Sequence, residues 1–142
     1  MKLSTRSRYG LRAVIDLASR SGESCVPLKT IAKHHGMSEY YLEQLFSPLK
    51  KAGLVASVRG AAGGYRLNKP PEDITAGDVL RVLEGSLTPV DCVDDENASC
   101  ASANCENCNT KSVWERLHTG MNEVLDTIRI SDLAAENVKE VI

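Results

Sequence analysis

The chain has 142 residues, of which 42% are hydrophobic, and this is enough apolar sequence for one packed domain. Its formal net charge of −2 excludes a protein that holds nucleic acid by bulk positive charge, so any contact with DNA needs a local basic patch, and Lys and Arg are concentrated in residues 1–69. Because neither a run of about 18 uncharged apolar residues nor a secretory signal is present, we expect a soluble cytoplasmic protein with no membrane partner.

The N-terminal third of the chain predicts three helices. In the first, apolar residues recur at helical spacing: Leu11, Val14, Ile15 and Ala18. A short second helix follows Pro27, and Gly36 supplies the turn after it. Ser38 is suited to cap a third helix, because its hydroxyl can accept a hydrogen bond from a free backbone amide. Pro48 lies inside that third helix, where it removes one backbone hydrogen bond, so we expect a kink or a break there.

The third helix and the segment after it together predict a winged helix-turn-helix. The helix has an apolar stripe for the core: Leu42, Leu45, Phe46 and Leu49. A short helix, a Gly-containing turn and a longer helix with polar residues near its start form the helix-turn-helix pattern. Two short strands are expected at residues 54–59 and 65–67, around a glycine-rich tip at residues 60–64. Such a hairpin behind a helix-turn-helix is a wing.

A fourth helix, a long loop and a long C-terminal helix complete the prediction. Thr75 is suited to cap the fourth helix, and Gly85 ends it. Residues 86–109 have neither helical nor strand periodicity. From Thr110 onward, apolar residues recur about every 3.5 positions: Trp114, Leu117, Met121, Val124, Leu125 and Ile128. This stripe needs a partner surface, so we expect it to pair with its copy in a homodimer, and we expect Ser131 to cap only a short last turn.

The expected fold is therefore mainly α with a small β-hairpin wing: a winged helix-turn-helix plus a long C-terminal dimerisation helix. Residues 1–85 are the expected DNA-binding domain, residues 86–109 a cysteine-rich cluster-binding loop, and residues 110–142 the dimerisation helix and tail. Double-stranded promoter DNA and a second copy of the chain are the expected partners. An enzyme is disfavoured, because the sequence shows no constellation of nucleophile, base and orienting acid.

Candidate DNA contacts lie on the third helix and on the wing. They are Ser38, Tyr40, Tyr41, Glu43, Gln44, Arg59 and Gly60. Gln44 fits an adenine edge, the hydroxyl groups suit phosphate or sugar, and Arg59 beside glycines can approach a phosphate or a narrow minor groove. Glu43 is repelled by phosphate and accepts only from a cytosine amino group, so it is a candidate selectivity element. The alternative is an ordinary solvated face with a surface hairpin.

Four of the five cysteines are clustered in the long loop: Cys92, Cys100, Cys105 and Cys108. Thiolates bind both zinc and iron–sulfur clusters, and the spacing alone leaves both open. Structural zinc sites usually have two tight Cys pairs, whereas only the last pair is tight here, which favours a cluster. Free thiols in a mobile loop are a further alternative. Cys25, His34, His35 and His118 are expected to be structural rather than ligating.

Five segments carry a recognisable combined pattern: Leu3–Asp16 (LSTRSRYGLRAVID), Tyr41–Leu45 (YLEQL), Gly53–Gly60 (GLVASVRG), Gly63–Tyr65 (GGY) and Thr75–Val79 (TAGDV). Together they resemble the IscR-type iron–sulfur regulators, in the Rrf-two family of winged helix-turn-helix transcription factors. The resemblance implies a winged-helix dimer in which Glu43, Gln44 and Arg59 contact DNA. It also implies a [2Fe-2S] cluster, with [4Fe-4S] as the alternative and zinc less favoured, donated by the iron–sulfur assembly machinery.

The function that the resemblance implies is a cluster-sensing transcriptional repressor of iron–sulfur assembly genes. A nitric-oxide- or iron-responsive repressor of the same family is one alternative, and a zinc-stabilised DNA-binding protein without sensing is another. The first three loop cysteines match the family's ligands in order, but their gaps differ and Cys108 stands where IscR has a histidine. Some relatives borrow an acidic ligand from the first helix of the other subunit, whereas the matching region here has Arg8 and no carboxylate before Asp16. The fourth ligand is therefore left open.

Overall fold

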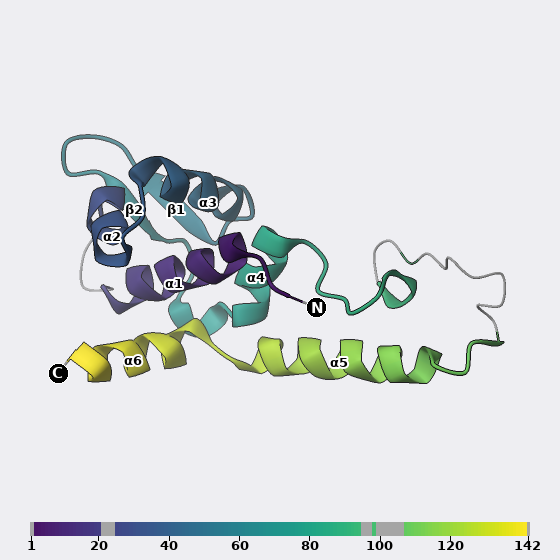
Figure 1. Cartoon of the computed structure of the whole chain (residues 1–142). Coiled ribbons are helices and arrows are strands. Elements are labelled where there is room, and N and C mark those ends of the chain that lie inside the picture. The colour runs from purple at the N-terminus through teal and green to yellow at the C-terminus, as the bar shows by residue number, and fades with distance from the viewer. Residues whose placement is uncertain (1, 21–24, 95–97, 99–106, 142) are drawn as a thin grey trace.

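The structure, a computed structural model, describes residues 2–20, 25–94, 98 and 107–141. In chain order the described elements are α1 (Thr5–Ser19), α2 (Leu28–His35), α3 (Glu39–Lys51), β1 (Val55–Val58), β2 (Gly64–Leu67), η1 (Pro71–Asp73), α4 (Ala76–Glu84), η2 (Asp91–Val93), α5 (Lys111–Thr127) and α6 (Ile130–Val141). The first four helices and the hairpin form a compact lobe, and α5 extends away from it (Figure 1). This is the expected mainly α winged-helix fold. None of the described helices is long and apolar enough to cross a membrane.

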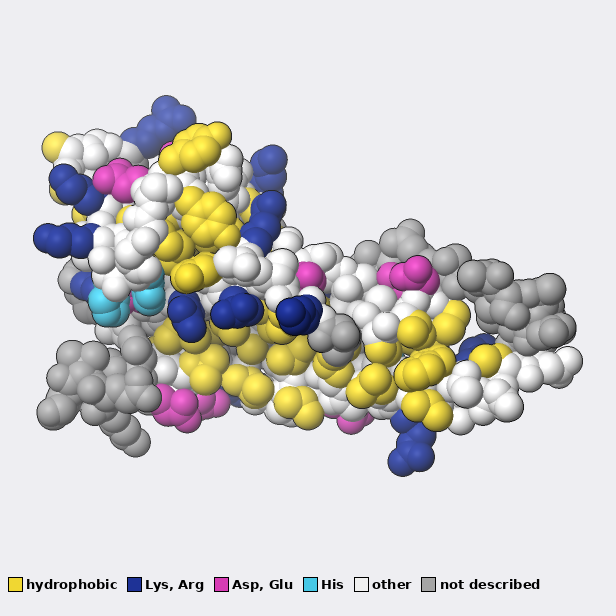
Figure 2. All heavy atoms as spheres, in the orientation of Figure 1, with side chains coloured by type: hydrophobic (Ala, Val, Ile, Leu, Met, Phe, Trp, Pro, Cys, Tyr) yellow, Lys and Arg dark blue, Asp and Glu magenta, His cyan; other side chains and the backbone are white. Residues whose placement is uncertain are grey.

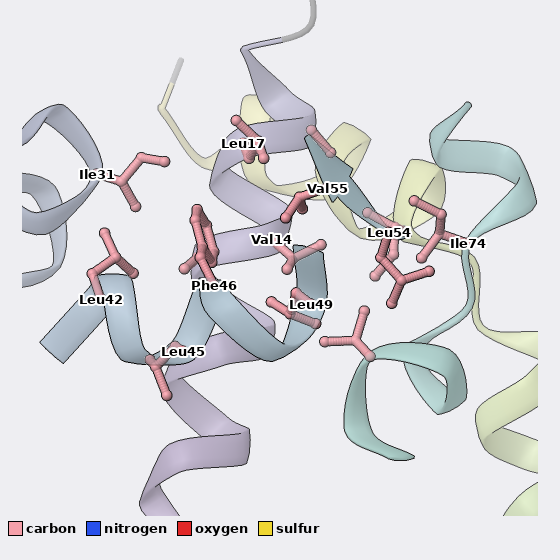
Figure 3. Packing of buried hydrophobic residues seen from close by; sticks show 14 of the residues in the cluster. Val14, Leu17, Ile31, Leu42, Leu45, Phe46, Leu49, Leu54, Val55 and Ile74 are labelled. Atoms are coloured by element: carbon pink, nitrogen blue, oxygen red, sulfur yellow. The ribbon is translucent and has the colours of Figure 1, made fainter. Parts of the chain in front are cut away.

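The core of the lobe lies where α1, α3 and β1 meet. Figure 3 shows Val14, Phe46 and Val55 pointing toward one another from these three elements. All four residues of the predicted α3 stripe are buried, which confirms the period assigned to that helix. Burying one such side chain contributes about 1.5–3 kcal/mol, so this stripe fixes the rotation of α3 about its axis. The opposite face of α3 is thereby left exposed to solvent.

Local caps set the helix boundaries near the recognition helix. The Ser38 hydroxyl accepts a hydrogen bond from the Tyr41 amide at 3.1 Å, as the sequence predicts. Thr75 and Asp78 form a reciprocal capping box at the start of α4, which confirms the predicted cap there. Gly36 has a φ of 63°, a left-handed conformation that a side chain would strain, and so it ends α2 and turns the chain toward α3.

The sequence predicts a kink or a break at Pro48, and the structure shows that α3 does not break there. The helix continues through this proline to Lys51. The hydrogen bond that proline removes belongs to the carbonyl of Gln44, an exposed residue whose backbone water can reach. Phe46 and Leu49 on either side of Pro48 are completely buried, and their packing holds the helix together across the missing bond.

The wing is an antiparallel hairpin that is joined to the body of the lobe. Its register pairs Val55 with Leu67 and Val58 with Gly64. Tyr65 exchanges two backbone hydrogen bonds of 2.8 Å with Val26, the residue that precedes α2 by two positions. A Cβ atom at Gly64 would overlap the carbonyl of Val26, so this close approach requires glycine. The base of the wing is therefore held in place by backbone contacts.

The C-terminal segment differs from the short last turn that the sequence predicts. It forms α6, twelve residues long, which lies alongside α1 (Figure 1). Ile130 is completely buried, and its amide donates to the carbonyl of Ile74 at 2.8 Å. The Ala76 amide donates to the carbonyl of Ile128 at the same distance. Ile130, Leu133 and Ala134 have the i, i+3, i+4 spacing of a helical face, so the sequence carried a signal for this helix that the prediction of a short turn missed. Packing against α1 supplies the stability that a short isolated helix lacks.

Two aromatic residues on α3 provide a matched test of this packing. Replacing Phe46 with Ala removes a completely buried ring and is expected to lower the free energy of unfolding by about 3–5 kcal/mol. Replacing Tyr40, which is 73% exposed, with Ala on the same helix should change it by less than about 0.5 kcal/mol. Urea unfolding followed by circular dichroism measures both, and equal losses in the two variants would contradict the assigned core.

Candidate DNA-binding surface and cysteine loop

Most of the candidate DNA contacts on α3 lie on its exposed side. Ser38, Tyr40, Glu43 and Gln44 are all exposed. Tyr41 is half-buried, and its ring meets the ring of Tyr9 edge-on, with 6.5 Å between centroids. The structure therefore brings four of the predicted residues to one surface and gives Tyr41 a packing role between α1 and α3.

Positive charge surrounds this surface. Figure 2 shows Lys and Arg side chains, in dark blue, around the lobe that contains α2, α3 and the wing. One of these cations is Arg12 on α1, whose guanidinium lies 5.5 Å from the centroid of the Tyr9 ring. The cations are thus gathered locally despite the net charge of −2. A negatively charged polymer is the partner that such a surface attracts.

The wing tip exposes Arg59 and Gly60, as the sequence predicts. Gly60 has a φ of 114°, and its carbonyl accepts a hydrogen bond from the Gly63 amide at 3.0 Å. A Cβ atom at Gly63 would overlap the carbonyl of Val58, so the turn needs glycine at this position as well. The tight turn leaves the Arg59 side chain free of packing at the end of the hairpin.

Sequence reasoning missed the part that Tyr65 has in this surface. Its ring packs against Phe46 with 5.0 Å between centroids, which joins the wing to α3. Burial, and then the negative charge of Glu43, raise the pKa of the Tyr65 hydroxyl above its usual value. Glu43 therefore acts electrostatically on the junction between α3 and the wing. No local signal could reveal this, because the two residues lie on different elements.

The structure describes two of the four loop cysteines. Cys92 is half-buried in η2, and with Lys111, Glu115 and His118 it lines a hollow of about 410 Å³. Cys108 is exposed near the start of α5. Cys100 and Cys105 lie outside the described residues. The two described thiols lie at the two ends of the loop.

The surroundings of Cys108 favour the thiolate form of its side chain. Its Sγ lies 3.3 Å from the Thr110 hydroxyl, and hydrogen bonds from the Thr110 side chain and backbone lower the pKa of the thiol below its usual value. Thiolate is the form that ligates metals, so this environment fits the donor chemistry of a cluster or zinc site. Cys25 differs, because its Sγ contacts the carbonyl of Ala62 at 2.9 Å near the wing.

The helix α5 has one face held by the lobe and one face open. Arg81 on α4 makes a two-pronged contact with Asp126, at 2.7 and 2.9 Å, and a third bond of 2.8 Å to Asn122. Three large apolar side chains of α5 are exposed: Val113 (53%), Leu117 (46%) and Val124 (59%). Figure 2 shows hydrophobic side chains along this part of the surface. An apolar face of this kind marks an interaction site.

Comparisons with known proteins agree with this arrangement. The model of the Rrf2 family, described as an iron-dependent transcriptional regulator, matches residues 3–136. The regulator CymR of Bacillus subtilis (strain 168) is 47% identical over 135 residues, which cover 95% of this chain and 91% of CymR. The solved structure of CymR, the global cysteine regulator of B. subtilis, has a TM-score of 0.78 and 44% identity, and the match covers 96% of this chain and 98% of that one.

A solved structure of T. potens IscR is also similar, with a TM-score of 0.74 and 47% identity over 96% of this chain and 88% of that chain. The family match covers most of the sequence and includes both the winged helix and α5. These relatives are transcriptional regulators and not enzymes. The chain therefore belongs to the Rrf2 family of DNA-binding transcriptional regulators.

Proposed function

We propose that this chain represses promoters as a homodimer and senses an iron–sulfur cluster held by the loop at residues 86–109. The observation that carries the proposal is the gathering of four cysteines between the winged-helix lobe and α5. Cys92, Cys100 and Cys105 are the proposed ligands, with Cys108 as the candidate for the fourth. A cluster bound there supplies a centre whose charge and integrity respond to iron, oxidants and nitric oxide.

In the proposed mode of DNA binding, α3 enters the major groove and the wing reaches the adjacent backbone. Gln44 reads a base edge, and Glu43 penalises sites that offer no cytosine amino group. Arg59 at the wing tip pairs with a phosphate or enters the minor groove. The exposed positions of these three residues support these roles.

The two proposed kinds of contact predict different mutant behaviour. Replacing Arg59 with Ala should weaken binding to all duplexes and reduce the slope of log affinity against log salt by about 1, because one phosphate contact is lost. Replacing Gln44 with Ala should cost about 1–3 kcal/mol on the preferred sequence only. Fluorescence anisotropy at several salt concentrations measures both, with an operator selected by the protein from random duplexes and a scrambled duplex.

Arg116→Ala provides the control, because Arg116 is an exposed cation on α5, away from the lobe. Its salt slope should equal that of the unsubstituted chain. An unchanged slope in the Arg59 variant would remove the wing from the proposed interface.

The proposed dimer uses the apolar face of α5. Exposing the large apolar side chains of this face to water is unfavourable. The opposite side of α5 is already in contact with Arg81 of α4. A second α5 offers a matching stripe, because a two-fold axis places the same surface on both copies. The two recognition helices then face two half-sites of one operator.

A charge on the apolar face should separate the two copies. Leu117→Asp is expected to give a monomer by sedimentation analysis, because a carboxylate cannot be buried in an apolar interface without a partner. The control is Thr119→Asp, since two residues further along a helix is about 200° around its axis. The Thr119 variant should remain dimeric. Because the core of the lobe does not include Leu117, the circular dichroism spectrum should be unchanged.

The position of the loop supports a coupling between occupancy of the proposed cluster site and DNA binding. Cys92 follows α4, which packs against α1 and α3, and Cys108 precedes α5. A metal centre bound by both Cys92 and Cys108 would therefore constrain the junction of α4 and α5, where Arg81 contacts Asp126. We propose that loading or loss of the cluster shifts this junction and so reorients the two recognition helices.

Anaerobic reconstitution with ferrous iron and sulfide tests the cluster. The unsubstituted chain should turn brown and contain iron and acid-labile sulfide, and DNA binding at fixed salt should differ between the loaded and unloaded forms. Cys92→Ser, Cys100→Ser and Cys105→Ser should each lose the visible absorption, whereas Cys25→Ser, a matched cysteine outside the loop, should keep it. The Cys108→Ser spectrum decides whether that thiolate is the fourth ligand.

Two outcomes would replace this function. A colourless protein with one bound zinc per chain indicates a structural metal without sensing. A chain that takes up no iron and binds DNA equally well after reconstitution favours a second candidate, a cysteine-responsive regulator. That candidate is supported by the likeness to the protein described as the global cysteine regulator of B. subtilis.

A further inference from the structure

A group of side chains with the chemistry to bind a metal lies far from the cysteine loop, inside the winged helix. Asp16 comes from α1, and His34 and His35 are the last two residues of α2. The Oδ2 atom of Asp16 lies 3.0 Å from His34 Nδ1 and 3.2 Å from His35 Nε2. All three candidate ligand atoms lie within 4.8 Å of one another. Asp16 is only 2% exposed, so its carboxylate is shielded from water and faces the two histidines.

Ordinary hydrogen bonding accounts for His34, whose Nδ1 is hydrogen-bonded to Asp16 Oδ2 at 3.0 Å, but not for His35. The Nε2 atom of His35 is buried and makes no hydrogen bond of acceptable geometry with any described residue, although it lies near the carboxylate. Successive residues on a helix point about 100° apart, yet the rings of His34 and His35 converge to 4.7 Å between centroids. Two imidazoles thus turn toward one carboxylate oxygen, and one of them gains no hydrogen bond from doing so.

We propose that Asp16, His34 and His35 bind a divalent transition-metal ion of the zinc class, which ties α1 to the end of α2. Imidazole and carboxylate are the ligands that suit zinc, and a tetrahedral ion about 2.0–2.1 Å from its ligands holds them about 3.3 Å apart. The two nitrogen-to-oxygen separations are close to that value. His34 is exposed, so water can fill the fourth position.

Arg20 orients the carboxylate of Asp16. Its Nε donates to the other carboxylate oxygen, Asp16 Oδ1, at 3.0 Å, and leaves Oδ2 to face the histidines. Ligating carboxylates are commonly oriented by such an outer hydrogen bond. The positive charges of Arg20 and Arg12 oppose a cation, so the site needs the buried carboxylate to balance them.

The position of this site gives it a consequence for DNA recognition. His35 is followed directly by Gly36, which turns the chain, and by Ser38, which caps α3. An ion that cross-links α1 and α2 therefore restrains the turn from which the recognition helix starts. The site is separate from the loop cysteines, so its occupancy does not depend on the proposed cluster.

Zinc titration of the full chain tests the proposal. The five cysteines are first replaced by Ser so that thiolates cannot bind the metal, and a native-sequence chain with its thiols alkylated serves as a second preparation. Isothermal titration with zinc chloride should show one site per chain. His34→Gln and His35→Gln should each weaken that affinity about tenfold or more, and His118→Gln, a buried histidine outside the site, should leave it unchanged.

A second measurement separates ligand loss from misfolding. Zinc should raise the melting temperature of the starting protein and of the His118 variant, and this increase should disappear in the His34 and His35 variants. His34 is on the surface, so its variant should keep the circular dichroism spectrum of the starting protein. Absence of zinc binding in both preparations overturns the proposal, and so does an affinity that the His34 and His35 variants share with the starting protein.

Discussion

The burial of α1 is the interaction on which the rest of the structure depends. This helix packs against α2, α3, α4, α6 and the second strand of the wing. Its close approach to α4 requires Gly10, where a Cβ atom would overlap the side chain of Leu83. At the same junction Ser7, which is completely buried, donates a hydrogen bond to Glu84. Displacing α1 therefore disturbs the recognition helix, the wing and the C-terminal helix together.

This central helix also links the two functions of a regulator. Through α3 and Tyr9 it supports the proposed DNA-binding surface, and through α4 it is connected to α5 by the contact between Arg81 and Asp126. The cysteine loop connects α4 to α5, so the proposed cluster would act on this side of the connection.

Overall likeness does not decide between the kinds of regulator within this family. The chain resembles solved structures of both CymR and IscR at similar TM-scores, because the winged helix and α5 are common to them. What distinguishes the possible signals is side-chain chemistry at a few positions. In this chain the proposed positions are the loop cysteines, and hydrogen bonds to Thr110 lower the pKa of the Cys108 thiol.

The sequence by itself determined the local structure. Apolar spacing gave the buried face of α3, and Ser38, Thr75 and Gly36 gave the helix ends, because periods, caps and turns depend on neighbouring residues only. The tertiary structure decided whatever depends on distant partners. Packing on both sides of Pro48 keeps α3 continuous, and contact with α1 stabilises α6 over twelve residues, where only a short turn was expected.

The same distinction holds for the functional residues. The loop cysteines are close in sequence and were visible as a cluster, and the exposed residues of α3 followed from its period. The meeting of Asp16 with His34 and His35 was not visible in the sequence, and neither was the influence of the Glu43 charge on the pKa of Tyr65, because these residues lie far apart in the chain and come near one another only on folding. Sequence determined which groups the protein has for its chemistry, and the packing of α1, α2, α3 and the wing decided which of them lie together.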